Sequence, residues 1–150
     1  MKRAIFAAVI LVVALVVVSR GCSSGGGKTE GDTLTRLSGD WVLKQLNGQD
    51  VSSMLGQGGR APTMTIGTDG RVSGFAGINR YTSSLDVDRL QKGDFKLDGI
   101  AATRMAGSQE MMDVESKFTQ ALHEVTGFKL DGGNLNLTRG LDDTLLKFSR

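Results

Sequence analysis

The sequence has almost none of the residues that most often build metal and disulfide sites. Among its 150 residues, Cys22 is the only cysteine and His123 the only histidine. A single cysteine excludes an internal disulfide framework and a thiolate metal cluster. A single histidine leaves no second imidazole for a metal site, and near the end of a helical segment it simply favours the negative end of the helix dipole. We therefore expect no metal and no cofactor.

A basic surface is also missing once the first residues are set aside. The chain has 18 Lys and Arg against 16 Asp and Glu, a net charge of +2. Lys2, Arg3 and Arg20 lie in the first 21 residues, and without them 15 basic and 16 acidic residues leave a net charge of −1. The other basic residues are scattered singly, without the stripe that is typical of nucleic-acid-binding proteins. The sequence predicts no nucleic-acid partner.

Residues 1–21 have the pattern of a secretory signal. Fifteen apolar residues, Ala4 to Val18, follow the basic start Met1-Lys2-Arg3. A cysteine directly after a small residue resembles a bacterial lipoprotein signal, so we predict such a signal at 1–21 and lipidation of Cys22. As a helix the apolar run would rise only about 22 Å, whereas a membrane span crosses a hydrocarbon core of roughly 30 Å.

Two alternatives remain open for this segment. Lipoprotein signals usually have Leu three residues before the cysteine and a small residue two before it, and here Ser19 and Arg20 stand there. The two alternatives are an uncleaved signal anchor and an ordinary cleaved secretory signal. The favoured location is the cell envelope, with the chain anchored to a membrane by its lipid, and Ser23 favours the outer membrane.

A flexible tether is predicted at residues 22–37. The stretch Ser23–Thr33 has no apolar residue to bury and is rich in glycine. We expect it to pack on nothing up to about Arg36, and to reach roughly 20 Å. Its sequence Gly25-Gly26-Gly27-Lys28-Thr29 looks like the end of a phosphate-binding loop but has neither the earlier glycine nor the strand that such a loop needs. Residues 38–150 then form one domain.

Alternation of apolar and polar residues predicts antiparallel strands in this domain. The clearest segments are 95–97, 128–130, 135–137 and 146–148, in which two apolar residues flank a polar one. A period of two is typical of half-buried antiparallel strands. Asp69-Gly70 and Asp131-Gly132-Gly133 are hairpin signals between such segments.

One segment near 108–126 has a helical period instead. Its apolar residues recur every three or four positions and are expected to be buried: Met111, Val114, Phe118, Leu122 and Val125. Glu110, Lys117 and Glu124 are expected to be exposed. Ser108 is the predicted N-cap, and Gly127 is predicted to end the helix in the left-handed conformation. One helix cannot bury this stripe alone, so it must lie on a curved antiparallel sheet, which makes the fold class β-rich α+β.

Six residues form a candidate polar cluster for binding or for structure. Three follow a strand with alternating small residues, two precede the helix and one lies on it: Asn79, Arg80, Tyr81, Thr103, Arg104 and Glu115. The favoured interpretation is that they satisfy buried backbone groups at a strand bend and a helix entry. No nucleophile and base can be paired at a recognisable spacing, so no catalytic residue and no enzyme are predicted. A hydrolase that uses Asn79, Arg80, Tyr81 and Glu115 is the weaker alternative.

Several ordered motifs resemble the META domain, also called HslJ-like. They are Trp41-Val42-Leu43 with Asn47-Gly48, the run 74–81, the run 103–107 with Glu115 and Phe118, and the ending segments 135–137 and 146–148. The resemblance covers residues 38–150. It implies a partly open antiparallel barrel, similar to lipocalins, of about seven to eight short strands with one packed helix.

The resemblance also implies a setting. Bacterial relatives are largely heat-shock-linked or uncharacterised envelope lipoproteins, and no enzymatic activity is established for the family. We expect a monomeric, membrane-tethered protein that supports envelope integrity or stress tolerance by binding an envelope protein or another envelope component. The alternative is a carrier of a small apolar ligand or acyl chain inside the barrel.

The chain departs from its relatives at two positions. They commonly have cysteine where this sequence has Ile78 and Gly107, which suggests that the two positions touch in the fold and that relatives join them by a disulfide. We predict that Ile78 is buried and contacts the backbone of Gly107, because a large side chain at one site would fill the room left at the other.

Overall fold

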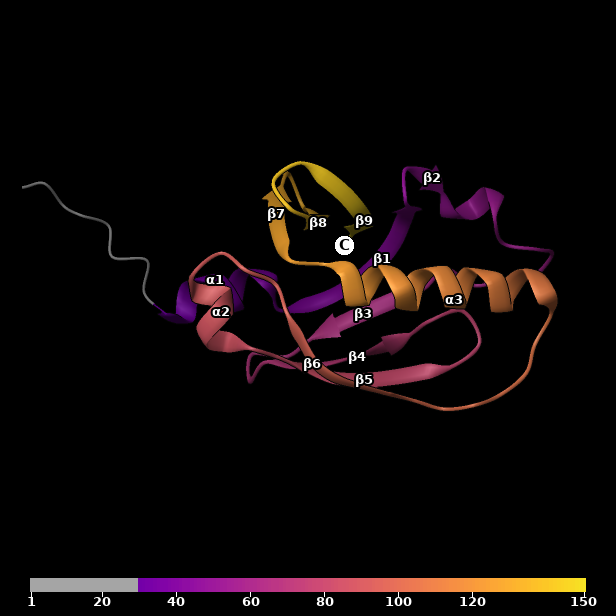
Figure 1. Cartoon of the computed structure of the whole chain (residues 1–150), viewed down its shortest axis with the longest axis horizontal. Coiled ribbons are helices and arrows are strands. Elements are labelled where there is room, and N and C mark those ends of the chain that lie inside the picture. Colours follow the sequence, from indigo (N-terminus) through magenta and orange to yellow (C-terminus); the bar gives the residue numbers. More distant parts are fainter. Residues whose placement is uncertain (1–29) are drawn as a thin grey trace, which may run out of the picture.

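A single antiparallel sheet organises residues 30–150, the part of the chain that this computed structural model describes (Figure 1). The strands are β1 Gly39–Leu46, β2 Gln49–Asp50, β3 Thr63–Ile66, β4 Arg71–Phe75, β5 Arg80–Leu85, β6 Leu97–Ala102, β7 Gly127–Asp131, β8 Asn134–Arg139 and β9 Asp143–Ser149. The helices are α1 Glu30–Leu37, α2 Val87–Gln91 and α3 Gln109–Glu124, with a 3-10 turn, η1, at Val51–Ser53. The predicted signal at 1–21 and the predicted lipidation site Cys22 lie outside the described residues.

The sheet confirms the predicted β-rich, partly open fold. Its strand order is β6-β5-β4-β3-β1-β9-β8-β7, with β2 paired to β1, and every pairing is antiparallel. The edge strands β6 and β7 are not paired with each other, and one isolated bridge joins Asp94, before β6, to Gly127 at the start of β7. The sheet has nine strands where seven to eight were expected. The additional short strand, β2, follows the turn Asn47-Gly48, whose two residues both have positive φ angles (50° and 78°).

Helix α3 covers the inner face of this sheet. Its residues Met111, Val114, Phe118 and Leu122, together with Val125 just after it, are all buried, as the helical period predicts. Phe118 packs its ring against those of Tyr81 and Phe148, with centroids 5.8 and 6.3 Å away. These ring contacts join α3 to both halves of the sheet, since Tyr81 lies on β5 and Phe148 on β9.

The outer face of α3 and its two ends differ in part from expectation. Glu110 and Lys117 are exposed as predicted, while Glu124 is half-buried beside Arg139. The Ser108 hydroxyl oxygen accepts a hydrogen bond from the Met111 N–H, which confirms the N-cap. The prediction for the other end is wrong, because the chain leaves the helix at Val125 in an extended conformation (φ −62°, ψ 133°) and Gly127 belongs to β7.

The prediction that the tether runs to residue 37 is wrong for its last part. Residues 30–37 form α1, and Leu34 and Leu37 are buried in the core. The indole N–H of Trp41 donates to the Leu37 carbonyl (2.7 Å). The guanidinium of Arg150, which lies over the Trp41 ring at 4.5 Å, donates to the Arg36 carbonyl (2.8 Å). The helix is therefore held from the start of β1 and from the end of the chain, contacts that no local pattern in a short glycine-rich segment would reveal.

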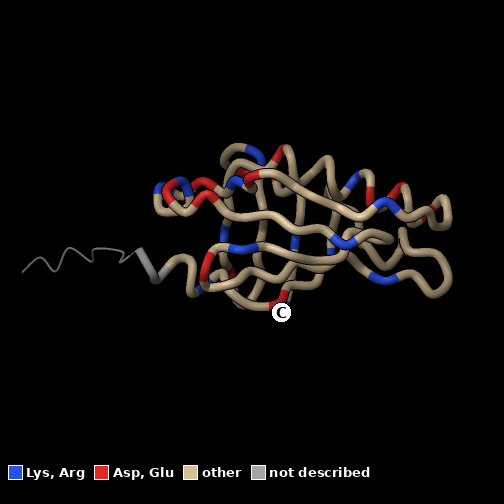
Figure 2. The backbone as a smooth tube through the Cα atoms, turned by 90° about the horizontal axis from the view of Figure 1, so that it is seen from below, with Lys and Arg blue, Asp and Glu red and all other residues tan. Residues whose placement is uncertain are grey.

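Helices α2 and η1 were not predicted either. Asp86 N-caps α2 by accepting from the Arg89 N–H (3.0 Å), and Leu90 of this helix is buried. No helix within residues 30–150 is long and apolar enough to cross a membrane. Acidic and basic residues are interspersed along the backbone in Figure 2, with both signs present at both ends of the domain.

Replacing Leu37 tests whether α1 belongs to the domain. Leu37→Ala should lower the free energy of unfolding by about 2–5 kcal/mol, because the side chain is fully buried and its loss leaves a cavity. Urea unfolding followed by the fluorescence of Trp41, the only tryptophan, measures this directly. The control is Arg36→Ala on the exposed side of the same helix, which should change the free energy by less than about 0.5 kcal/mol. Equal stability of the two variants would show that α1 does not dock.

Candidate functional site

Three of the six predicted polar residues, Asn79, Thr103 and Glu115, meet where α3 passes the connection between β4 and β5. Gly77, in that connection, has a φ of 139°, and a Cβ atom there would lie 3.2 Å from the Met111 carbonyl oxygen and 3.3 Å from the Glu115 Cβ. A side chain at this position would both strain the backbone and press against the helix. Glycine therefore lets the connection lie directly on α3, within reach of Glu115.

The Glu115 carboxylate binds this connection by three hydrogen bonds. One oxygen, Oε2, accepts from the backbone N–H groups of Ile78 (2.9 Å) and Asn79 (2.7 Å). The other, Oε1, accepts from the Asn79 side-chain amide (2.7 Å). Hydrogen bonds to an ionised acceptor are stronger than neutral ones, so one side chain fixes the helix against the sheet connection.

Asn79 extends the network to the segment that precedes α3. Its side chain is 5% exposed, and its amide nitrogen also donates to the Met105 carbonyl (3.1 Å). Its amide oxygen accepts from the Met105 N–H (2.7 Å) and from the Thr103 hydroxyl (2.8 Å). All four hydrogen-bonding positions of the carboxamide are thus used, which is how a buried amide avoids an unsatisfied polar atom.

The other three members of the predicted cluster lie elsewhere. Arg80 joins Thr103 through its backbone, and its side chain is exposed on the outer face of the sheet. Tyr81 is buried on the inner face, where its hydroxyl donates to the Thr63 carbonyl (3.0 Å), and burial raises its pKa. Arg104 is exposed, with no hydrogen-bond or ion-pair partner in residues 30–150. The structure therefore unites only Asn79, Thr103 and Glu115, as a structural network.

Ile78 and Gly107 are in contact, as predicted. A Cβ atom on Gly107 would lie 2.5 Å from the Ile78 Cδ1 and 2.8 Å from its Cγ1. The prediction that Ile78 is buried is wrong, because the side chain is half-buried. It sits at the surface above the Asn79 network, so it fills the space beside Gly107 while keeping one side open to solvent.

A shallow apolar groove lies over the same network. We call it the methionine groove, and its apolar lining consists of Ile78, Met105 and Met112. Its volume is about 330 Å³, and Glu115, Ser116, Thr119 and Gln120 complete it. Met105 is 58% exposed and Met112 44% exposed. Sequence reasoning missed both methionines, although Met112 stands one position outside the buried stripe of α3 and so was an apolar residue on the solvent side.

A second groove lies on the outer face of β3, β4 and β5. We call it the arginine groove, and it is lined by Arg60, Phe75 and Arg80 with the hydroxyl side chains of Thr63, Thr65, Ser73 and Thr82. Its volume is about 290 Å³. The guanidinium of Arg60 lies over the Phe75 ring, 5.2 Å from its centroid. Of the residues that line this groove, Arg80 and Tyr81 were singled out from the sequence. The others come together through strand pairing, which the sequence alone does not display.

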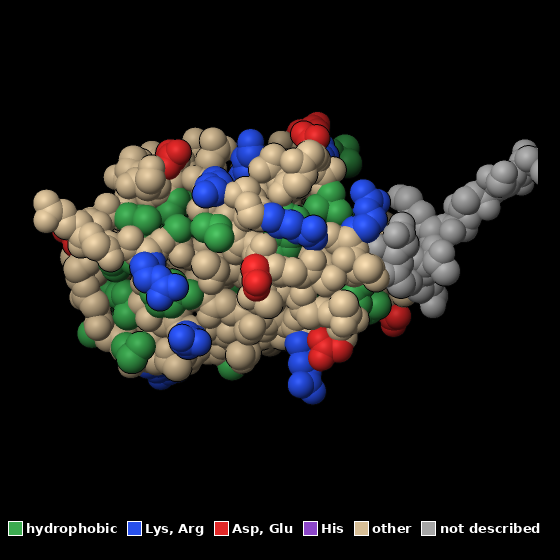
Figure 3. All heavy atoms as spheres, turned by 180° about the vertical axis from the view of Figure 1, so that it is seen from behind, with side chains coloured by type: hydrophobic (Ala, Val, Ile, Leu, Met, Phe, Trp, Pro, Cys, Tyr) green, Lys and Arg blue, Asp and Glu red, His purple; other side chains and the backbone are tan. Residues whose placement is uncertain are grey.

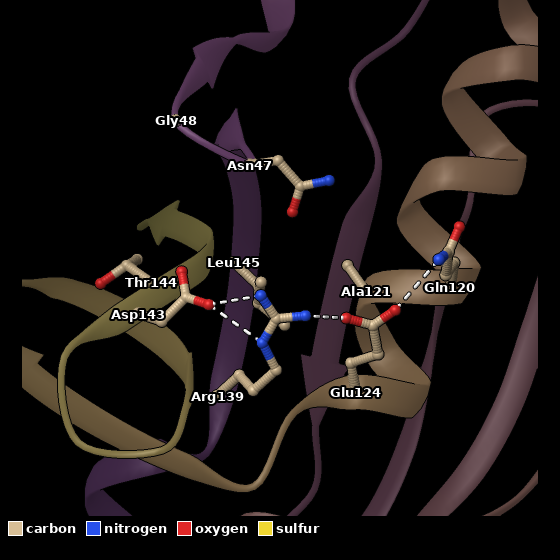
Figure 4. A pocket seen from close by; sticks show the side chains of 9 residues that line it. All are labelled: Asn47, Gly48, Gln120, Ala121, Glu124, Arg139, Asp143, Thr144 and Leu145. Carbon is tan, nitrogen blue, oxygen red and sulfur yellow. Dashed lines mark hydrogen bonds and ion pairs between the residues drawn. The ribbon is translucent and has the colours of Figure 1, made fainter.

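The largest of these surface hollows, about 470 Å³, surrounds Arg139 (Figure 4). The guanidinium bonds Glu124 of α3 on one side and Asp143 of β9 on the other (2.6 and 2.9 Å to Asp143). The hydrogen bonds to Asp143 are the main cause of the raised pKa of the Arg139 guanidinium. Both carboxylates are thus engaged with one cation, so the arrangement ties the end of α3 to the β8–β9 hairpin.

Metal-type clusters are not found in the part of the chain that the structure describes. No three side chains of His, Cys, Asp or Glu stand close enough there to hold an ion. Of the surface grooves, the methionine groove is lined by apolar side chains and the arginine groove by two arginines, while the buried Asn79 side chain serves the fold.

Comparison with known proteins identifies relatives of the domain. The family model described as the META domain matches residues 32–150. An NMR structure of a protein from Burkholderia xenovorans is 25% identical, with a TM-score of 0.55, over 80% of this chain and 87% of that one. A second protein whose structure was solved by NMR is 21% identical, with a TM-score of 0.55, over 73% of this chain and 86% of that one. This second match is evidence for a shared fold alone. None of the curated proteins compared with the chain matches it.

The Glu115 network can be tested by its effect on stability. Glu115→Ala should lower the free energy of unfolding by about 2 kcal/mol, because two backbone N–H groups and one amide lose a charged acceptor. Combined with Asn79→Ala, the loss should be smaller than the sum of the two single losses, since both changes break one network. Glu110→Ala, on an exposed position of the same helix, is the control. Strictly additive effects in urea unfolding would contradict the network.

The contact between Ile78 and Gly107 predicts an engineered crosslink. The 2.8 Å distance and a Cβ–Cγ1 bond of about 1.5 Å place the two Cβ atoms at most about 4.3 Å apart, within the range of disulfides. Ile78→Cys with Gly107→Cys, in a Cys22→Ser background, should form a disulfide and raise the free energy of unfolding by about 3 kcal/mol. Ile78→Cys alone is the control. Two thiols that still react with maleimide after oxidation would disprove the prediction.

Proposed function

Since the chain belongs to the META-domain family, we propose that it is a non-enzymatic binding protein of the cell envelope. In this proposal a lipid on Cys22 holds it at a membrane, with the outer membrane favoured, and the methionine groove docks an apolar segment of an envelope protein. By this binding the monomer supports envelope integrity or stress tolerance.

The observation that carries the proposal is that the methionine groove exposes apolar side chains on a backbone held by hydrogen bonds. Both backbone hydrogen-bonding groups of Met105 are held by the Asn79 side chain, while its own side chain is more than half exposed. Methionine side chains are flexible and polarizable, and they are frequent where one surface accepts apolar side chains of varied shape. A rigid backbone beneath adaptable side chains reduces the ordering cost of binding.

The position of the groove fits a tethered protein. The described chain begins at α1, whereas the loop between β6 and α3 and the start of α3 lie at the opposite end of the domain (Figure 1). If the preceding residues lead to a membrane anchor, the methionine groove points away from that membrane. A partner elsewhere in the envelope would then reach it without competing with the anchor.

The alternative of an apolar ligand inside the sheet finds less support. The space between the sheet and α3 is occupied by large side chains, among them Trp41, Phe118 and Phe148, each no more than 1% exposed. An acyl chain would have to displace several of them, at a cost of lost packing contacts. We therefore favour docking at the surface.

Complementation of a gene deletion tests the proposed function. The deletion should raise the uptake of a hydrophobic dye and lower survival after heat shock, and the unchanged gene should restore both. Cys22→Ala should fail because it removes the anchor. Met105→Glu with Met112→Glu should fail because it places charges in the methionine groove.

The control for the groove variant is Leu141→Glu, the same kind of change at a side chain that is 86% exposed on the β8–β9 turn. It should restore both phenotypes. Normal permeability and survival in the deletion strain would count against any envelope role. Native mass spectrometry that finds a bound lipid in the purified protein would favour the carrier alternative instead.

A further inference from the structure

Three strands present a patterned outer face at the end of the domain that lies away from α1. Strand pairing sets Thr63, Phe75 and Arg80 opposite one another in one row. It sets Thr65, Ser73 and Thr82 opposite one another in the next row. Since side chains alternate between the faces of a sheet, all six lie on the outer face, opposite the buried Met64, Val72 and Tyr81.

The two arginines that line the arginine groove have no carboxylate partner in residues 30–150. Arg60 stacks on Phe75, and Arg80 has only its backbone hydrogen bonds. By contrast, Arg71, Arg89 and Arg139 each form an ion pair with an aspartate. Asp40 is at the rim, where its carboxylate accepts from the Thr65 hydroxyl (2.7 Å). Two unpaired guanidiniums beside one groove favour an oxyanion, which they bind with paired N–H donors.

The hydroxyl groups narrow the chemistry of the ligand. The Thr63 hydroxyl oxygen accepts from the Phe75 N–H (3.2 Å), which leaves its proton to donate. The Thr65 hydroxyl donates to Asp40, which leaves its oxygen to accept. The hydroxyls of Ser73 and Thr82 have no partner in the described residues, so each can do both. A ligand that carries hydroxyl groups of its own as well as a negative charge matches this lining.

We propose that the arginine groove binds an acidic carbohydrate of the envelope, with a sugar carboxylate or phosphate on Arg60 and Arg80 and the sugar hydroxyls on the threonine and serine side chains. The volume of about 290 Å³ lies just below the usual range of ligand pockets, roughly 300–1,000 Å³, and so suits one sugar ring of a longer chain. This site is separate from the methionine groove and goes beyond the protein docking proposed above.

The placement of the groove favours a polymer over the headgroups of the anchoring membrane. The β3–β4 turn with Gly70 packs near Val87 of α2, on the side of α1, while Phe75 and Arg80 lie at the other ends of their strands. Seen from behind α3 in Figure 3, basic side chains stand singly beside hydrophobic ones. Such a face offers a few defined contacts, whereas binding to an anionic bilayer usually depends on a cluster of basic residues.

Calorimetry with defined probes tests the proposal. The full chain, in a detergent that contains no sugar, is titrated with hexagalacturonate, maltohexaose, polyglutamate, inorganic phosphate and vesicles of phosphatidylglycerol. Hexagalacturonate should bind at least tenfold more tightly than neutral maltohexaose and than polyglutamate. Arg60→Gln with Arg80→Gln should weaken its binding at least tenfold, and Ser73→Ala with Thr82→Val should weaken it about threefold.

The matched control removes the same charge elsewhere. Arg36→Gln with Arg89→Gln, two exposed arginines on α1 and α2, should change the binding of hexagalacturonate less than twofold, and so should the methionine groove variant Met105→Glu with Met112→Glu. Amide chemical shifts on titration should change around Thr63, Phe75 and Arg80. An unchanged Trp41 emission spectrum confirms that each variant is folded.

Several outcomes would overturn the inference. If both double arginine variants lost the same affinity for hexagalacturonate, the weaker binding would be an effect of net charge alone. Tighter binding of the vesicles or of inorganic phosphate would make the ligand a lipid surface or a simple anion, and equal binding of polyglutamate would remove the role of the sugar. Shifts centred on the Arg139 hollow, or no saturable binding of hexagalacturonate, would also refute it. None of these results bears on protein docking at the methionine groove.

Discussion

An open antiparallel sheet with an apolar inner face needs a cover, and the structure depends on how α3 provides it. Burial of Phe118 between Tyr81 and Phe148 supplies the apolar attraction, which has little directionality. The Glu115 carboxylate adds direction, because its three hydrogen bonds fix where along the sheet the helix lies. Apolar packing thus holds α3 on the sheet, and the polar network fixes its position along the sheet. The opposite end is held in the same manner by Arg139, between α3 and the β8–β9 hairpin.

This difference between apolar packing and polar bonding explains why polar residues that look like a binding site in the sequence have a structural role. Asn79 and Glu115 use their side-chain atoms to bind the backbone of segments far apart in the chain. A buried amide that is fully hydrogen-bonded is costly to disturb and specifies one arrangement. A segment whose backbone is held by buried side chains can leave its own side chains exposed to solvent. Met105 is such a case, with a held backbone and an exposed thioether.

The two grooves therefore arise from different parts of the fold. The methionine groove lies where the helix meets the loop before it, and its apolar side chains favour a protein partner. The arginine groove lies on the outer face of three paired strands, and its unpaired guanidiniums and free hydroxyls favour an acidic sugar. Both are far from α1, where the described chain begins. In the function that we propose, a domain tethered through that end holds a protein and a polymer of the envelope at the same time.

Local patterns in the sequence determined the strands around 128–130, 135–137 and 146–148, the phase of α3 and its N-cap, because alternation and helical period reflect which face of an element is buried. They were less accurate at 95–97, where only Leu97 lies in a strand, β6. The likeness to the META domain was also visible in its ordered motifs. Only the tertiary structure decided that residues 30–37 form a docked helix, since Leu34 and Leu37 are just two apolar residues. The contacts that hold the helix come from later in the chain, where Trp41 donates to the Leu37 carbonyl and Arg150 to the Arg36 carbonyl. It also decided which residues share a surface. Thr63, Phe75 and Arg80 become neighbours through the pairing of three strands, and strand register depends on long-range contacts that a single sequence does not display.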